Sequence, residues 1–393
     1  MTKLELLSGQ DPQEFVEPIA VIGIGGCFPD AANISQFWQN ICAGHVAIRE
    51  VPKDRWNAEL YYHSERGQRD KTYSKIGAFI ESVPFERKLF RIPPRTLEVI
   101  DPIQKLALTS VYAALEDANL QTMPGSEGRS FNRERCSVIV GNSMGGEFNG
   151  RTIHRAYFPE VLEALRGTAV WRGLSEVEQA QLSQEFEQGY KASTPEITED
   201  TMPGELANCI AGRIANVFDL SGHNFTTDAA CASSLAAVQA AVYALRAGDT
   251  DVVVAGGADS QMDPPSFIKF SQIGALSGEL SAPFDQRASG FVMGEGVGML
   301  VLKRLSDALA DGDRIYAQIL GVGAASDGKG KGITAPNPRG QRLAIERAYE
   351  QAQVPIESVG LFEAHGTSTP VGDAVEVGVL TECLKSSGAP ARE

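Results

Sequence analysis

Short apolar runs closed by glycine alternate with longer amphipathic segments along the chain. The apolar runs are rich in β-branched residues and occupy positions 19–26, 136–141, 251–256, 297–302, 315–321 and 359–364. Runs of this kind are typical of strands buried on both faces of a parallel sheet. Helical periodicity covers residues 102–119 and 339–353. Strands that alternate with helices predict an α/β fold.

A charged segment between about residues 151 and 200 interrupts this alternation. It contains the helix-favouring sequence EVEQAQLSQEFEQ and ends in the polar run ASTPEITED. We interpret it as a helical insertion on the sheet scaffold, either a solvated surface segment or a substrate gate. Residues 1–16 are expected to form a flexible lead-in.

The composition is that of a soluble globular protein. Of 393 residues, 43% are hydrophobic and 22% charged, which excludes a disordered chain, a collagen-like chain and a disulfide-stapled mini-protein. The net charge of −15 disfavours binding to nucleic acid. No run resembles a membrane span of roughly 20 apolar residues, and the N-terminus lacks a signal-peptide pattern. We therefore expect a cytoplasmic protein.

Cysteine and histidine spacing predicts neither a disulfide framework nor a metal site. The six cysteines lie far apart without a CxxC pair, and the five histidines show no zinc-ligand spacing. A lone cysteine in such a chain is by default a small buried hydrophobe.

Two glycine motifs fail as nucleotide-binding signatures. Phe28 occupies the third glycine position of a dinucleotide fingerprint, and Gly330 replaces the magnesium-binding Ser or Thr of a P-loop. The segment 141–145 matches the GxSxG pattern of a nucleophile elbow, with Ser143 at its centre. A serine hydrolase that uses Ser143 therefore stays an alternative.

A stronger signal surrounds Cys231. Leu and Val side chains at positions 235, 238, 242 and 245 share one helical face, and Gly248 follows as a stop. Cys231 is thus predicted at or just before a helix N-terminus, where the helix dipole favours the nucleophilic thiolate. Local physics alone supports a reactive and a packing cysteine equally.

The position of His365 favours the reactive interpretation of Cys231 over the packing one. His365 follows the strand-like run 359–364, so it is predicted at the C-terminal strand end, where open α/β sheets bind ligands. A histidine there can perform acid–base chemistry, although one histidine alone is more simply structural. Together, a cysteine at a helix start and a histidine at a strand end predict nucleophilic catalysis.

From about Glu17 onward the chain resembles a β-ketoacyl synthase of polyketide and multifunctional fatty-acid synthases. The resemblance rests on ordered motifs: IAVIGIGGCFP at 19–29, RIPP at 91–94, DPIQ at 101–104, LEDA at 115–118, DAACASS at 228–234, PFDQRASGFVMGEG at 283–296 and EAHGT at 363–367. The DAACASS form and the long insertion are most similar to the polyunsaturated-fatty-acid, enediyne and heterocyst-glycolipid branch.

This resemblance implies a thiolase-like fold, in which two similar βα halves form five αβαβα layers, in a homodimer. The N-terminal half would span residues 17–306 and the C-terminal half residues 314–393. It also implies partnership with an acyl carrier protein and with other domains of a multienzyme synthase. No cofactor would be bound, because substrates arrive on the carrier's phosphopantetheine.

The resemblance also assigns roles. Cys231 would accept an acyl chain from the carrier thioester, and its backbone N–H would donate to the oxyanion. His365 would stabilise the enolate formed when a malonyl thioester loses carbon dioxide. Thr367 and Thr369 would shape the pantetheine approach or simply order their loop, and Asp373 and Glu376 would be structural.

The chain departs from the family after Lys385-Ser386. The Lys-Ser-x-x-Gly-His segment, which supplies a second catalytic histidine and a lysine, and the Gly-Phe-Gly-Gly-Thr-Asn oxyanion loop do not occur. We therefore expect an incomplete second half and weak or no condensation by this chain alone. A non-catalytic, synthase-like partner is the alternative, although such partners typically lose the nucleophile that Cys231 represents.

Overall fold

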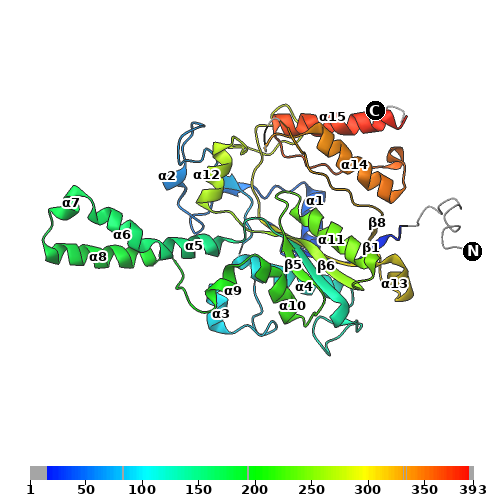
Figure 1. Ribbon diagram of the computed structural model, residues 1–393, viewed down its shortest axis with the longest axis horizontal. Coiled ribbons are helices and arrows are strands. Elements are labelled where there is room, and N and C mark those ends of the chain that lie inside the picture. The colour runs from blue at the N-terminus through cyan, green and yellow to red at the C-terminus, as the bar shows by residue number, and fades with distance from the viewer. Residues whose placement is uncertain (1–15, 82–83, 193, 331, 333, 389–393) are drawn as a thin grey trace, which may run out of the picture.

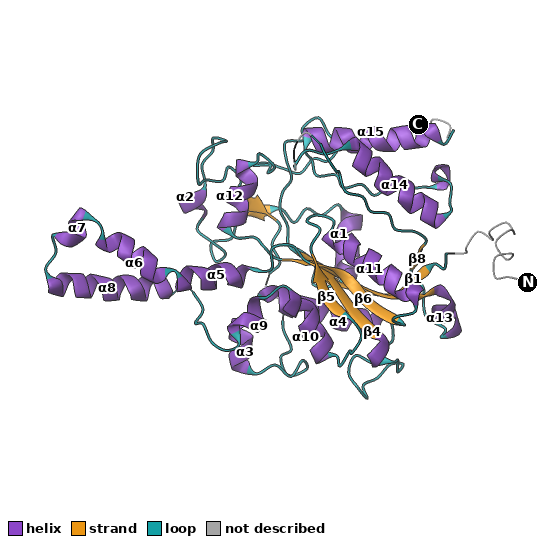
Figure 2. Ribbon diagram, in the orientation of Figure 1, coloured by secondary structure: helices purple, strands orange, loops and turns teal. Residues whose placement is uncertain are grey.

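A computed structural model describes residues 16–81, 84–192, 194–330, 332 and 334–388. Figures 1 and 2 show a twisted sheet at the centre with helices on both faces. The expected lead-in at 1–16 lies outside the described residues, apart from Val16.

The strands are β1 (Ile19–Cys27), β2 (Arg49–Glu50), β3 (Ile76–Gly77), β4 (Cys136–Gly141), β5 (Asn224–Thr227), β6 (Val252–Asp259), β7 (Gly296–Arg304) and β8 (Ala317–Ile319). The helices are α1 (Ile34–Ala43), α2 (Ala58–Tyr61), α3 (Pro94–Val99), α4 (Pro102–Asp117), α5 (Glu147–Ala156), α6 (Phe158–Arg166), α7 (Ala169–Arg172), α8 (Glu176–Lys191), α9 (Thr201–Glu205), α10 (Asn208–Val217), α11 (Ser233–Ala247), α12 (Pro264–Gln272), α13 (Leu305–Ala310), α14 (Pro338–Ala352) and α15 (Pro370–Ser386), with short 3-10 turns at η1 (Arg133–Arg135) and η2 (Ile356–Ser358).

The main sheet has the strand order β5-β4-β6-β7-β1-β8 and is mixed, not parallel. Strands β5, β4 and β6 are parallel, whereas β7 is antiparallel to both β6 and β1, and β8 is antiparallel to β1. The expectation of a parallel neighbour for the first strand was therefore wrong. Its apolar run reflects burial on both faces, which antiparallel neighbours also permit.

Each face of the sheet has its own hydrophobic core. On one face, helices α4 and α10 pack against the strands through Leu108, Ile214 and their neighbours. On the other face, α11 packs against β4 and β6 through Val238, Val242 and Leu245. The sheet is thus fixed between helices, and the start of α11 lies over the ends of β4 and β6.

Among the described residues, helix α11 falls in the window Ala230–Ala247, which is long and apolar enough to cross a membrane by length and composition alone. Buried residues of the same helix pack on the sheet, as in the core helix of many α/β proteins. Leu235, the first residue of the predicted apolar face, is 71% exposed. It lies in the first turn, above a cavity, where the sheet no longer covers it.

Helices α5 to α8 form an arm that projects from the body of the molecule (Figure 1). Ring contacts among Phe158, Phe186 and Tyr190 give the arm a small core. Trp171 of α7 is buried as well. A capping box at Ser175 starts its longest helix, α8. The segment expected as an insertion at 151–200 is mainly helical, and its first helix starts at Glu147.

The second half comprises β8, α14 and α15 within the described residues. Strand β8 extends the main sheet, and the described part of the chain forms no second large sheet. The run 359–364 forms no strand, because no described strand pairs with its backbone. Helix α15 begins soon after this run, at Pro370.

A buried ion pair fastens the end of β7 to the loop after α13. Lys303 is 4% exposed, and its ammonium lies 2.9 Å from Asp313 and also contacts Asp311. Arg129 binds the same two carboxylates. Removing one partner from a buried pair leaves an uncompensated charge in a medium of low polarity.

We expect Lys303→Met to lower the free energy of unfolding by about 2 kcal/mol, because the buried Asp313 carboxylate loses a charge-assisted hydrogen bond and keeps only its pairing with Arg129. Urea denaturation measures the change. Lys75→Met is the matched control, since Lys75 pairs with Glu50 at the surface, where water screens the pair, and its loss should cost much less than the loss of Lys303. Equal losses in the two variants would contradict the prediction.

Candidate active site

Cys231 lies two residues before the first residue of α11, as the sequence predicts. Strand β5 ends at Thr227, and a tight turn follows in which Ala230 has the positive φ of 51°. The Ser233 hydroxyl closes this turn, because it accepts the N–H of Ala229 at 2.9 Å and donates to the carbonyl of Ala230 at 2.6 Å. Cys231 is thereby held, exposed, at the start of the helix.

Two glycines let the first turn of α11 approach the sheet. A Cβ atom on Gly141, at the end of β4, would lie 2.3 Å from the carbonyl of Ser233. A Cβ atom on Gly257, in β6, would lie 2.6 Å from the Ser234 side chain. Any larger residue at either position would push the helix start, and Cys231 with it, away from the strand ends.

His365 belongs to a loop that precedes α15 and is held by Glu376 of that helix. The Glu376 carboxylate accepts the backbone N–H of His365 at 2.7 Å and that of Gly366 at 3.0 Å. Gly366 has a φ of 54°, and a Cβ atom there would press on Phe284 and Pro283. The loop is therefore compact and closely packed beside the imidazole.

Hydrogen bonds to the segment 282–290 hold this loop in place. The buried Ser368 accepts the N–H of Ala282 on its hydroxyl at 2.9 Å, and its carbonyl accepts the N–H of Gly290 at 2.8 Å. Asp373 accepts the N–H of Phe284 at 2.7 Å. The two segments lie far apart in sequence, so these contacts position His365 in space.

The side chains of Cys231 and His365 interact with each other. This interaction is the main reason why the pKa of the Cys231 thiol lies below its ordinary value and the pKa of His365 lies above its own. Burial opposes both shifts, and the N–H of Cys231 itself also favours the thiolate. The pair can therefore exist as a thiolate next to an imidazolium, the reactive state of a nucleophilic cysteine.

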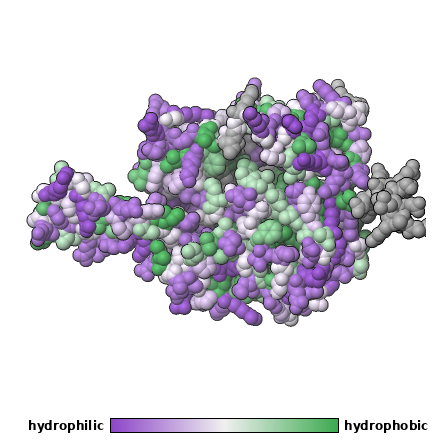
Figure 3. Space-filling view, viewed as in Figure 1, coloured by the Kyte–Doolittle hydropathy of each residue, from purple (hydrophilic) through white to green (hydrophobic). Residues whose placement is uncertain are grey.

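Cys231 opens into a cavity of about 720 Å³. Glycine-rich strand ends form much of its lining, together with Phe28, Phe37 and Leu235. Figure 3 shows apolar residues gathered in the hollowed centre of this face, with polar residues around them. A cavity of this size and polarity suits a ligand with a hydrocarbon part.

Ser143 lies in the loop after β4 and lines the same cavity. A nucleophile elbow would turn directly from strand to helix, whereas α5 begins only at Glu147. The backbone strain in the loop falls on Met144, with a φ of 68°. Because the structure pairs His365 with Cys231, the geometry favours the cysteine over the serine.

Thr367 and Thr369 contact each other through their hydroxyl oxygens, 2.9 Å apart. Both side chains are half-buried in the His365 loop. The contact orders the loop, and a role in guiding pantetheine stays a prediction.

Among the described residues, His365 is the histidine that interacts with Cys231. The described part of the chain has no group of three or more His, Cys, Asp or Glu side chains that could hold a metal ion.

Glu376 and Ser368 act on the site through His365, and sequence spacing alone did not indicate how. Glu376→Ala is expected to lower acyl transfer to Cys231 by about 10²-fold, since a loop displaced by an ångström loses the contact between imidazole and thiol. The pH at which Cys231 becomes reactive should rise at the same time. Glu376→Gln keeps an acceptor oxygen and should lose less.

Rates of Cys231 alkylation across a pH series test this prediction. A merely destabilising change would reduce the amount of folded chain without moving the pH midpoint. An unchanged midpoint in folded Glu376→Ala would show that the carboxylate does not position His365.

Comparison with known proteins places this geometry in a family. The N-terminal domain of β-ketoacyl synthases matches residues 16–308, and the C-terminal domain of β-ketoacyl synthases matches residues 316–392. The chain is 36% identical over 372 residues to a polyunsaturated fatty acid synthase protein of Thraustochytrium sp., covering 94% of this chain and 13% of that protein. It is 32% identical to polyketide synthase PksM of Bacillus subtilis, and the match covers 93% of this chain and 7% of that protein.

Solved structures agree. An oxazolomycin ketosynthase domain of Streptomyces albus superposes with a TM-score of 0.75 at 31% identity, covering 94% of this chain and 56% of that one. A ketosynthase from module 6 of the bacillaene synthase of Bacillus subtilis superposes with a TM-score of 0.74 at 29% identity, and the match covers 94% of this chain and 55% of that one. The chain thus spans about half of these solved chains and a small part of the curated relatives. Its fold is α/β and thiolase-like, and the chain belongs to the β-ketoacyl synthase family.

Proposed function

We propose that this chain transfers an acyl group from the phosphopantetheine thioester of an acyl carrier protein to Cys231. The interacting pair of Cys231 and His365 at the start of α11 carries the proposal. The thiolate attacks the thioester carbonyl, the new S–C bond forms, and the pantetheine sulfur leaves. The imidazolium of His365 can return the proton that this sulfur needs.

Condensation would follow at the same site. A malonyl thioester loses carbon dioxide, and His365 stabilises the enolate oxygen. The enolate carbon attacks the acyl carbonyl on Cys231, the S–C bond breaks, and a β-ketoacyl product forms.

Intact mass spectrometry after incubation with an acyl-carrier thioester tests the proposal. A mass gain equal to the acyl group supports it, and malonyl carrier is then added to look for release of β-ketoacyl product. If the chain is folded by circular dichroism and gains no mass, the non-catalytic, synthase-like partner becomes the better interpretation.

We further propose that two copies of the chain pair through β5. This strand lies at an edge of the sheet and pairs with β4, so its other edge offers unpaired backbone groups within the described part of the chain. Phe225 on the strand is 41% exposed, and Asn224 is exposed as well. An uncovered edge that carries an exposed aromatic side chain favours strand pairing between copies.

Light scattering should give twice the chain mass of 42.1 kDa for the wild type. Phe225→Asp should shift the mass toward the monomer, because the charge would be desolvated in the paired edge. Val177→Asp, on the exposed face of the arm, is the control and should leave the mass unchanged. A wild-type monomer at micromolar concentration would contradict the pairing.

A further inference from the structure

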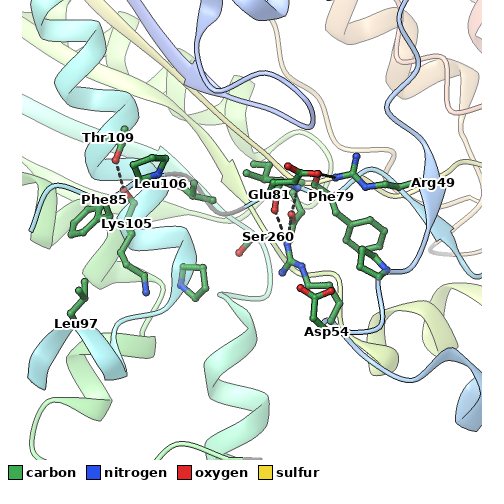
Figure 4. Close-up of a pocket in the computed structure, with 16 residues that line it drawn as sticks. Arg49, Asp54, Phe79, Glu81, Phe85, Leu97, Lys105, Leu106, Thr109 and Ser260 are labelled. Atoms are coloured by element: carbon green, nitrogen blue, oxygen red, sulfur yellow. Dashed lines mark hydrogen bonds and ion pairs between the residues drawn. The ribbon is translucent and has the colours of Figure 1, made fainter. Parts of the chain in front are cut away.

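A second cavity, of about 710 Å³, lies on the other side of Glu295 from the Cys231 cavity, since this glutamate lines both. One wall carries apolar side chains from α3, α4 and the segment before them, including Phe85, Leu97 and Leu106. The opposite wall carries Arg49, Asp54 and Phe79 (Figure 4). The volume is within the range of small-molecule sites in proteins.

The cations on the opposite wall already have anionic partners. Arg49 donates to Asp30 at 2.7 Å and to the carbonyl of Phe79 at 2.7 Å. Arg55 donates to both oxygens of Glu295, at 2.6 and 2.7 Å. These guanidinium groups are held in place by the fold and need no ligand.

Lys105 differs from them. Its side chain reaches from α4 toward Leu97, and no hydrogen bond or ion pair ends on its ammonium within the described residues (Figure 4). Asp101, one turn earlier on the chain, attracts the ammonium from a distance only, because its two oxygens accept the N–H groups of Ile103 at 2.9 Å and Phe148 at 2.8 Å. Burial outweighs this attraction and lowers the pKa of Lys105, because a buried ammonium loses solvation that the distant carboxylate does not replace.

We infer that this cavity binds an aliphatic monocarboxylate, with the carboxylate on Lys105 and the chain on Phe85, Leu97 and Leu106. A carboxylate supplies the charge-assisted hydrogen bond that the ammonium lacks. Contact between the hydrocarbon chain and the apolar wall removes apolar surface from water, which favours binding. A doubly charged phosphate fits less well, because Asp54 and Glu81 on the cavity lining would repel it more strongly.

Isothermal titration calorimetry of the full chain with decanoate tests the inference. Decanoate should bind, and Lys105→Met should weaken it at least about tenfold while Lys105→Arg retains it. Leu97→Trp, which fills the cavity and keeps the cation, should also weaken binding. Lys269→Met is the matched control, because this lysine of α12 does not line the cavity. Circular dichroism checks that each variant is folded.

Two further titrations separate this site from the Cys231 cavity and from a simple anion site. Decanoate should bind equally to chain whose Cys231 has been alkylated, so the result does not depend on acyl transfer. Decanol and inorganic phosphate should each bind at least about tenfold more weakly than decanoate. The inference is overturned by no binding to the folded wild type, by equal binding to Lys105→Met, by loss after alkylation, or by phosphate binding as tightly as decanoate.

Discussion

Cys231→Ala is expected to abolish the acyl mass gain completely. The structure offers Cys231 as the cysteine that is exposed at a helix start and interacts with a histidine, and the lowered pKa of its thiol favours the nucleophilic thiolate. Alanine removes the sulfur that forms the thioester and leaves the turn that precedes α11 intact. Intact mass and peptide mapping after incubation with acyl carrier measure the result.

Two controls make this result specific. Cys42→Ala removes another exposed cysteine, in α1, and should acylate like the wild type. Ser143→Ala removes the alternative nucleophile from the same cavity and should also acylate. The opposite pattern, with an acylated Cys231→Ala and an inert Ser143→Ala, would establish the serine hydrolase instead.

His365→Ala is expected to slow acyl transfer by about 10²- to 10⁴-fold, the range for loss of a general acid–base group. The hydrogen bond from His365 is the largest cause of the lowered Cys231 pKa, so its loss should move that pKa upward, toward the ordinary value of 9.0. The thiolate would then be abundant only at higher pH. Reactivity at neutral pH should fall, and much of it should return in alkaline buffer.

Alkylation of Cys231 by iodoacetamide across a pH series measures this shift directly. The wild-type profile should rise at a lower pH than that of His365→Ala, and a plateau at high pH should be common to both. His223→Ala is the control, because His223 precedes β5 and does not contact Cys231. Superimposable profiles for the wild type and His365→Ala would show that the imidazole does not govern the thiol.

Periodicity in the sequence was enough to identify the long central strands and the helices α4, α11 and α14. The β-branched runs at β1, β4, β6 and β7 form strands, and the apolar face at 238–245 forms the buried side of α11. The place of Cys231 just before that helix follows from the small residues ahead of the apolar face and from Gly248 after it. These signals are local, because alternation and helical spacing reflect which face of each element is buried.

Local signals did not determine which strands are neighbours. The run at β1 is equally compatible with parallel and antiparallel partners, and only the sheet shows that β7 lies between β1 and β6. The run 359–364 has strand composition but no ladder partner among the described strands. Strand formation needs a partner as well as a propensity.

By itself, the sequence determined that the chain has an α/β core, a helical insertion and a cysteine at a helix start. The tertiary structure decided that His365 meets this cysteine, through contacts such as the one between Ser368 and Ala282, which are 86 positions apart. It also placed Lys105 in a second cavity, where no hydrogen bond or ion pair from another described residue reaches its ammonium. Such contacts depend on how distant segments pack, and burial patterns along a single chain do not specify which distant partner completes them.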